Sequence, residues 1–132
     1  MALTIKELFE KNKQAYKQQF YLDSVFLSYN LILKTAKQIC SDEGINMGSS
    51  KLKLSDVNKH LKSHYAKSPM FTKKLKKSVF KDVCLFNDEF KALSKELKYQ
   101  YPELKLKNAA KRGLDILVKL NTSLIKLKNN SH

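Results

Sequence analysis

Apolar residues recur at spacings of three and four along almost the whole chain, and only 3 glycines and 2 prolines interrupt them. This spacing brings side chains onto one face of an α-helix, whereas a half-buried strand would alternate apolar and polar residues. Proteins built of many short strands also need more glycine and proline for their turns. The sequence therefore predicts an all-α fold: a bundle of about five helices, three long and two short, with up-down packing.

The expected helices are separated by short polar or proline-containing breaks. They run over about 5–16, 20–41, 55–67, 72–99 and 103–128. Thr4 and Ser55 are the expected N-caps, and Gly44 is the expected residue just after the second helix. Residues 44–53 form the one obvious loop. Pro69 marks the end of the third helix, because the residue before a proline avoids the helical region.

Two of these helices have long apolar lines. On the second helix the line comprises Leu22, Val25, Phe26, Tyr29, Leu33, Ala36 and Ile39. On the fourth helix it comprises Leu75, Val79, Val83, Phe86, Phe90, Leu93 and Leu97. Such a line on an amphipathic helix faces the core of a globular domain, so we expect these side chains to be buried.

The 132 residues are expected to form one domain over 1–132, with a frayed tail at 128–132. A hydrophobic content of 42% argues against a disordered chain. The N-terminus lacks the apolar stretch of a signal peptide, and lysine interrupts every long apolar run. We therefore expect a cytoplasmic protein that does not engage a membrane.

The charge of the chain is strongly positive and unevenly placed. The formal net charge is +14, yet residues 1–50 hold 6 lysines and 5 acidic residues and contribute almost none of it. A positive field of this size favours RNA, DNA or another polyanion as a partner. The alternative is that lysine is merely frequent, as in proteins from AT-rich genomes. The single arginine argues against base-specific readout, because lysine offers a point charge and not a planar fork.

The fourth expected helix would separate its charges onto two edges. The nucleic-acid-binding residues are expected on its basic edge: Lys73, Lys77, Lys81, Lys91, Lys95 and Lys98. The opposite flank carries Asp82, Glu89 and Glu96. We expect these acids to pair with lysines of the fifth helix, namely Lys111, Lys119 or Lys126. The basic edge is then left for phosphates or, as the alternative, for solvent.

Lys59, His60 and His64 form the one constellation with catalytic potential. On a helix the two histidines lie one turn apart on a shared face, beside the lysine. One imidazole would take the proton of a 2′-hydroxyl while the lysine stabilises charge on the phosphorane. The alternative is a pair of surface histidines without a catalytic role.

No motif predicts a metal site or a cofactor. Cys40 and Cys84 lack the spacing of a zinc site or of a disulfide framework. Each lies within a helical pattern and is expected to be a small packing residue. The chain also lacks a glycine-rich phosphate loop and the Glu-x-x-His motif of di-iron bundles.

Three short strings and the order of the helices resemble one known family. Residues 21–34 resemble the long N-terminal helix of the HEPN family, and 99–103, Tyr-Gln-Tyr-Pro-Glu, resembles its Arg-Tyr-Pro-Asp turn. An alanine-rich segment, 108–112, begins the last helix here as it does in the family. The resemblance implies a HEPN-like helical bundle.

The family's ribonucleases carry an arginine, a polar residue, three variable residues and a histidine. Residues 59–64 have this spacing with Lys59 in place of the arginine, so the resemblance implies that His64 is the catalytic histidine and His60 the polar residue. Members commonly form homodimers through their long helices. Many act beside a nucleotidyltransferase or in toxin–antitoxin and other bacterial defence systems.

Three functional hypotheses follow from these observations. The first is a HEPN-like homodimer that binds RNA or nucleotide, or a partner protein that processes nucleic acid. The second is a metal-independent ribonuclease that uses Lys59, His60 and His64. The third is a protein-interaction module in which the positive charge does not bind nucleic acid.

Overall fold

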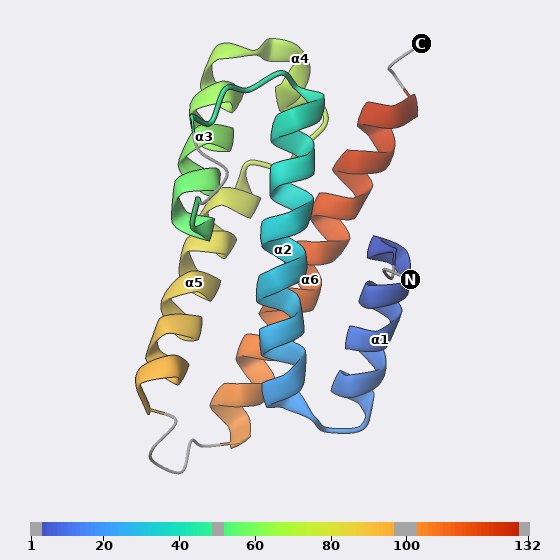
Figure 1. Cartoon of the computed structure of the whole chain (residues 1–132), viewed down its shortest axis with the longest axis vertical. Helices are drawn as coiled ribbons and strands as arrows, with labels where there is room; N and C mark the ends of the chain where they lie inside the picture. Colours follow the sequence, from blue (N-terminus) through green and yellow to red (C-terminus); the bar gives the residue numbers. More distant parts are fainter. Residues whose placement is uncertain (1–3, 49–51, 97–102, 130–132) are drawn as a thin grey trace.

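A computed structural model of the chain describes residues 4–48, 52–96 and 103–129. Six helices make up the regular structure of this part of the chain, in which no strand occurs. They are α1 (Ile5–Lys17), α2 (Tyr21–Asp42), α3 (Leu54–Lys67), α4 (Pro69–Thr72), α5 (Ser78–Glu96) and α6 (Glu103–Asn129) (Figure 1). The expected all-α bundle with three long and two shorter helices is confirmed, and the four-residue α4 is added to it.

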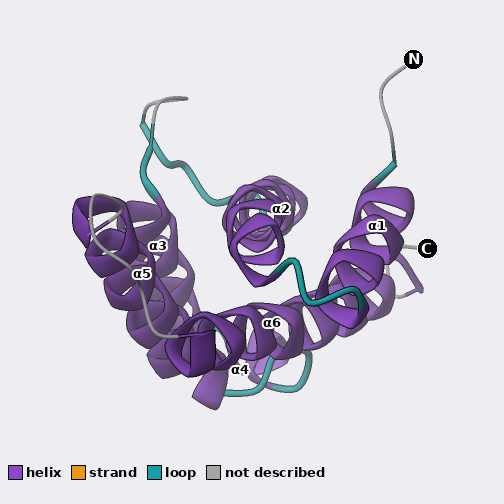
Figure 2. Cartoon of the chain, turned by 90° about the horizontal axis from the view of Figure 1, so that it is seen from below, coloured by secondary structure: helices purple, strands orange, loops and turns teal. Residues whose placement is uncertain are grey.

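The central helix of the bundle is α2. In a view along the helices, α1, α6, α5 and α3 form an arc that partly surrounds it (Figure 2). Accordingly, α2 contacts all four of these helices. The pairs α1/α2 and α5/α6 are antiparallel, as up-down packing requires, whereas α3 and α6 run parallel to α2 (Figure 1).

A wider face of α2 is buried than its apolar line predicts. Ten of its residues are buried, and they include Leu31, Ile32 and Cys40, which lie off that line. By contrast Phe26, expected in the core, is 36% exposed. Leu22, Tyr29 and Leu33 of the predicted line are half-buried. The buried face is wider than the line because four other helices contact α2 and cover small side chains as well as large ones.

Small polar side chains are buried between α1 and α2. The amide nitrogen of Asn12 donates to Ser28 Oγ at 2.8 Å, and its carbonyl oxygen accepts from Ser24 Oγ at 2.6 Å. All three residues are fully buried. A buried polar group without a partner costs about 1–3 kcal/mol, so these bonds hold α1 in one register on α2.

The backbones of α2 and α6 approach each other closely at Ser28. A Cβ built on Gly113 of α6 would lie 2.7 Å from both Cβ and Oγ of Ser28, and 2.9 Å from Cε2 of Phe86. Glycine is less favourable than alanine inside a helix by about 1 kcal/mol. The close contact among α2, α5 and α6 therefore explains why residue 113 is a glycine, which helix propensity alone would disfavour.

The helix ends agree with the expected caps in two cases out of three. Thr4 caps α1 through its side-chain oxygen, as expected. Gly44 adopts a φ of 68° and closes α2 in a Schellman motif. The expected cap Ser55 is wrong, because α3 begins one residue earlier and the Asp56 carboxylate accepts the backbone N–H of Lys53 at 3.2 Å.

The expected helix over 72–99 is wrong at its start, because a turn over 73–77 separates α4 from α5. Four of these five turn residues are lysines. If the helix continued through this segment, lysines three or four positions apart, such as Lys73 and Lys77, would be neighbours on its surface. Like charges at that spacing destabilise a helix. Leu75 within the turn is still buried, and the Ser123 hydroxyl of α6 donates to the carbonyl oxygen of Lys74 at 2.6 Å.

The apolar line is confirmed for the described residues. Its buried members are Leu75 in the turn and Val79, Val83, Phe86 and Leu93 on α5, while Phe90 is half-buried. Leu97, Lys98 and the 99–102 part of the predicted Tyr-Gln-Tyr-Pro-Glu turn lie outside the described residues. α6 continues through 128 and 129, and 130–132 also lie outside the described part.

Substitution Gly113→Ala tests the close approach of α2 and α6. We expect it to lower the free energy of unfolding by about 1–3 kcal/mol, even though alanine favours the helix, because the new methyl group overlaps Ser28 and Phe86. Urea denaturation followed by circular dichroism measures the change. The matched control is Asp115→Ala on the exposed side of α6, expected to change stability by no more than about 0.5 kcal/mol. A Gly113→Ala variant as stable as the wild type would contradict the packing.

Candidate functional site

Two acidic residues of α5, Asp82 and Glu89, face α6. Lys119 Nζ donates to Asp82 Oδ2 at 2.9 Å, which confirms the expected pairing with that lysine. Glu89 pairs with the guanidinium of Arg112, whereas Lys111 is exposed. Such partly exposed pairs contribute little to stability, about 0–1 kcal/mol each, but they fix how α5 is rotated. The side chains of Glu96 and Lys126 lie outside the described residues.

The expected basic edge is divided between two elements. Lys73 and Lys77 lie in the 73–77 turn, and Lys81, Lys91 and Lys95 lie on α5; all five are exposed. Lys98 lies outside the described residues. The prediction of one continuous lysine stripe on one helix was therefore wrong for the first two lysines, because their like charges oppose a helix there.

A pocket of about 1000 Å³ opens between α3 and the segment from α4 to α5. It is lined by Lys62, Tyr65, Ala66, Thr72, Lys77, Ser78, Phe80, Lys81 and Cys84. Small-molecule sites have volumes of about 300–1,000 Å³, so this pocket is at the upper end of their range. We call it the α3–α5 pocket.

The α3–α5 pocket combines an apolar floor with a cationic rim. The buried Phe80 and the half-buried Tyr65 meet edge to face, with ring centroids 5.2 Å apart. Lys62, Lys77 and Lys81 are exposed around them, and no acidic residue lines the pocket. None of these three lysines forms an ion pair with a described residue. The pocket is therefore suited to an anion that also has an apolar or aromatic part.

The wall of this pocket is held by a buried amide. Asn58 of α3 is buried, and its side-chain nitrogen lies 3.0 Å from the carbonyl oxygen of Phe80 and 3.4 Å from Cys84 Sγ. The bond to a main-chain carbonyl fixes α3 against α5 at the level of the pocket. Asn58 therefore sets the spacing between the two walls.

The two cysteines have different surroundings. Cys40 is fully buried, as expected of a packing residue, and burial raises the pKa of its thiol from 9.0 to about 11. Cys84 is exposed and lines the α3–α5 pocket. The expectation that Cys84 packs in the core was wrong, because its position on α5 faces the pocket.

The predicted catalytic residues Lys59, His60 and His64 all lie on α3, at the expected spacing of one turn. Lys59 is exposed and His60 is half-buried. His64 Nε2 lies 3.1 Å from Oε1 of Glu43, the residue that follows α2. His64 thus ties the end of α3 to the end of α2.

Glu43 also faces the 73–77 turn. Its second carboxylate oxygen lies 4.0 Å from Lys74 Nζ. The His64 ring packs against Phe71 of α4, with centroids 5.0 Å apart. The structure therefore brings together a carboxylate, a histidine and a lysine, but from α2, α3 and the turn and not from the 59–64 segment alone.

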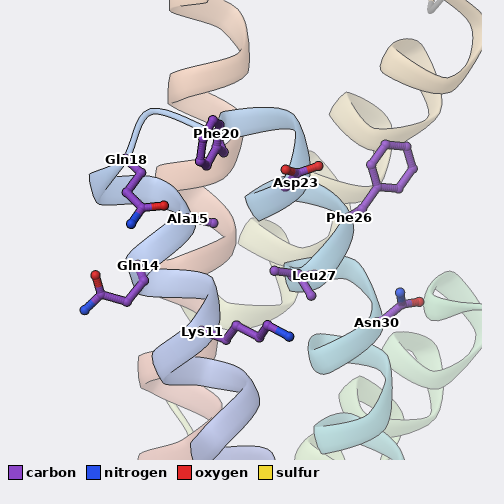
Figure 3. A pocket seen from close by; sticks show the side chains of 9 residues that line it. All are labelled: Lys11, Gln14, Ala15, Gln18, Phe20, Asp23, Phe26, Leu27 and Asn30. Carbon is purple, nitrogen blue, oxygen red and sulfur yellow. The ribbon is translucent and has the colours of Figure 1, made fainter.

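A second pocket lies between α1 and α2, with a volume of about 480 Å³. Lys11 and Gln14 line it from α1 and Gln18 from the end of that helix, and α2 contributes Asp23 and Leu27, among others (Figure 3). Phe20, in the connection between the helices, is 56% exposed beside it. This pocket is lined by one lysine and one aspartate, so it lacks the excess of lysine that lines the α3–α5 pocket.

In the described part of the chain, no group of three or more His, Cys, Asp and Glu side chains is arranged to hold a metal ion. Likewise, no helix there is long and apolar enough to cross a membrane.

No family model matches the sequence. No match was found among curated proteins, and none among solved structures. The resemblance to the HEPN family is therefore carried by the quoted strings and the helix order alone.

The sequence did not point to Tyr65 and Cys84 as site residues. Tyr65 lies at helical spacing from the apolar residues Val57 and Leu61, which gives no sign of a pocket, and Cys84 was expected to be a small packing residue. Lys62, Lys77 and Lys81 were visible as basic residues, but their convergence depends on the turn between α4 and α5. A signal for that turn exists in the run of lysines at 73–77.

The different exposure of the cysteines predicts their reactivity. We expect iodoacetamide at pH 8 to modify Cys84 and not Cys40, because thiolates react and Cys40 is buried with its pKa raised to about 11. Mass spectrometry of intact and digested protein should show one modified cysteine under native conditions and two in denaturant. The Cys84→Ser variant, expected to stay unmodified until denatured, is the control. Equal modification of both thiols in the native protein would contradict this arrangement.

Proposed function

We propose that this protein binds RNA through lysines of α3, the 73–77 turn and α5. The observation that carries the proposal is the rim of the α3–α5 pocket, where three exposed lysines from three elements converge without an acidic residue. Asp82 and Glu89 are paired with α6 and so do not neutralise this face. Lysines placed in this way neutralise phosphates without reading base identity.

The resemblance to the HEPN family belongs to this proposal. The bundle has a long second helix and a long last helix with its alanines, and this order supports the resemblance. A HEPN-like homodimer that acts on RNA beside a partner protein is the form of the proposal that the resemblance favours. The RNA-binding step depends only on the lysines named above.

The test of this proposal is a comparison of two triple variants with equal loss of charge. Lys62→Ala/Lys77→Ala/Lys81→Ala removes the rim of the pocket. The control Lys6→Ala/Lys17→Ala/Lys34→Ala removes three exposed lysines from α1 and α2. Fluorescence anisotropy with a labelled single-stranded RNA is measured over a range of salt concentrations.

We expect the rim variant to lose affinity at low salt and to reduce the slope of log affinity against log salt by about 2, because about 0.7 is expected per phosphate neutralised. The control should change the slope much less. Equal effects of both variants would show that only net charge matters. An absence of RNA affinity in the wild type at low salt would contradict the proposal and favour a protein-interaction module.

A ribonuclease is the second candidate, and the hydrogen bond between His64 and Glu43 favours it. A carboxylate that holds a histidine ring in place is a common arrangement for a general base. Lys59 and His60 lie on the same helix as His64, and these three residues are the catalytic set of this second candidate.

The two candidates differ in RNA cleavage. We expect RNA to stay intact when it is incubated in EDTA with wild-type protein, because His64 links α2 to α3 in the binding-protein account. Gel electrophoresis of the RNA measures cleavage, with His64→Ala as the paired sample and thermal melts of both proteins as the folding control. Cleavage by the wild type that His64→Ala abolishes in a folded protein would establish the ribonuclease instead.

A further inference from the structure

We infer that the α3–α5 pocket receives one unpaired base of the bound RNA, stacked on Tyr65, while adjoining phosphates contact the surrounding lysines. The protein then selects single strands over duplexes. This inference rests on the proposed RNA binding and deepens it, because it names the form of RNA that the site takes.

The floor of the pocket provides the surface for a base. Tyr65 meets Phe80 and Phe71 edge to face, at interplanar angles of 75° and 73°. No described ring is stacked face to face on Tyr65. Its ring lines the pocket together with Cys84 and Ala66. Aromatic side chains at the bottom of a cationic groove are the usual platforms for unpaired bases.

The lysines are placed around this floor from two sides. Lys62 lies on α3, one turn before Ala66. Lys77 lies in the turn before α5, and Lys81 lies near the start of α5. A strand that inserts one base between α3 and α5 therefore meets cations on both walls. Charge complementarity favours phosphates here, because the nine lining residues include three lysines and no acid.

A duplex makes poor use of such a pocket. Its bases are paired and stacked inside the helix, so a duplex offers only phosphates and sugars to a surface of lysines. The apolar floor of Tyr65, Phe80 and Cys84 then stays unfilled. The geometry thus discriminates between single-stranded and double-stranded RNA.

Protection of Cys84 tests the inference on the unaltered protein. Cys84 lines the pocket, and the buried Cys40 serves as an internal reference in the same sample. Alkylation by iodoacetamide is timed by mass spectrometry in the presence of a short oligouridylate, the same strand paired with its complement, or ribose 5-phosphate. We expect the single strand, at about ten times its Kd, to slow modification of Cys84 about tenfold. The duplex and ribose 5-phosphate should leave the rate unchanged.

Substitution of Tyr65 tests the stacking itself. Tyr65→Phe retains the ring and should bind oligouridylate like the wild type. Tyr65→Leu should reduce affinity about five- to hundredfold, the range expected for loss of one stacked base. Phe26→Leu, a change at an exposed aromatic residue of α2, is the matched control and should have no effect. Thermal melts establish that each variant is folded, and the protection of wild-type Cys84 needs no variant.

The outcomes separate this inference from the proposed function. Equal affinity of Tyr65→Leu and wild type, or equal protection of Cys84 by single strand and duplex, would overturn the base pocket. RNA binding through Lys62, Lys77 and Lys81 would survive that result. An absence of any RNA affinity would remove both.

Discussion

The close contact between α2 and α6 is the constraint on which the rest of the fold depends. Gly113 lets the α6 backbone approach Ser28, and Ser28 in turn accepts a hydrogen bond from Asn12 of α1. Gly113 and Ser28, one small residue in each of these two helices, thus set the distance between α2 and α6. Ser28 also holds α1 in place through its hydrogen bond with Asn12. Larger side chains at either position would separate α2 from α6 and open the arc of helices around α2. Polar and small residues, and not only the large apolar ones, decide this architecture.

The rotation of α5 follows from its contacts with α6. Asp82 and Glu89 are drawn toward Lys119 and Arg112, and the apolar line of α5 faces the core. The remaining edge, with its lysines, is left exposed. The break over 73–77 then places Lys77 beside α3, so that lysines from both sides surround Tyr65 and Cys84. The ion pairs between α5 and α6 and the break over 73–77 thus gather part of the positive charge of the sequence at one site.

The helices were largely predictable from the sequence, whereas the site was only partly so. Periodicity identified the long helices, Thr4 correctly marked the start of α1, and Gly44 correctly marked the end of α2. The burial of Ser28 was not predictable, because a serine on a helix gives no sign that another backbone will approach it. The α3–α5 pocket was missed for a related reason. Its residues come from separate segments, and only tertiary packing shows that an apparent core residue such as Tyr65 lines a cavity.

The central claim is that the positive charge acts at one face, made by α3, the 73–77 turn and α5. Backbone amide chemical shifts of ¹⁵N-labelled protein, followed by NMR during titration with a short single-stranded RNA at low salt, test this claim most directly. The account predicts that the shift changes concentrate in residues 62–84. Changes spread evenly over the lysine-bearing helices, or concentrated on α1 and α2, would contradict it.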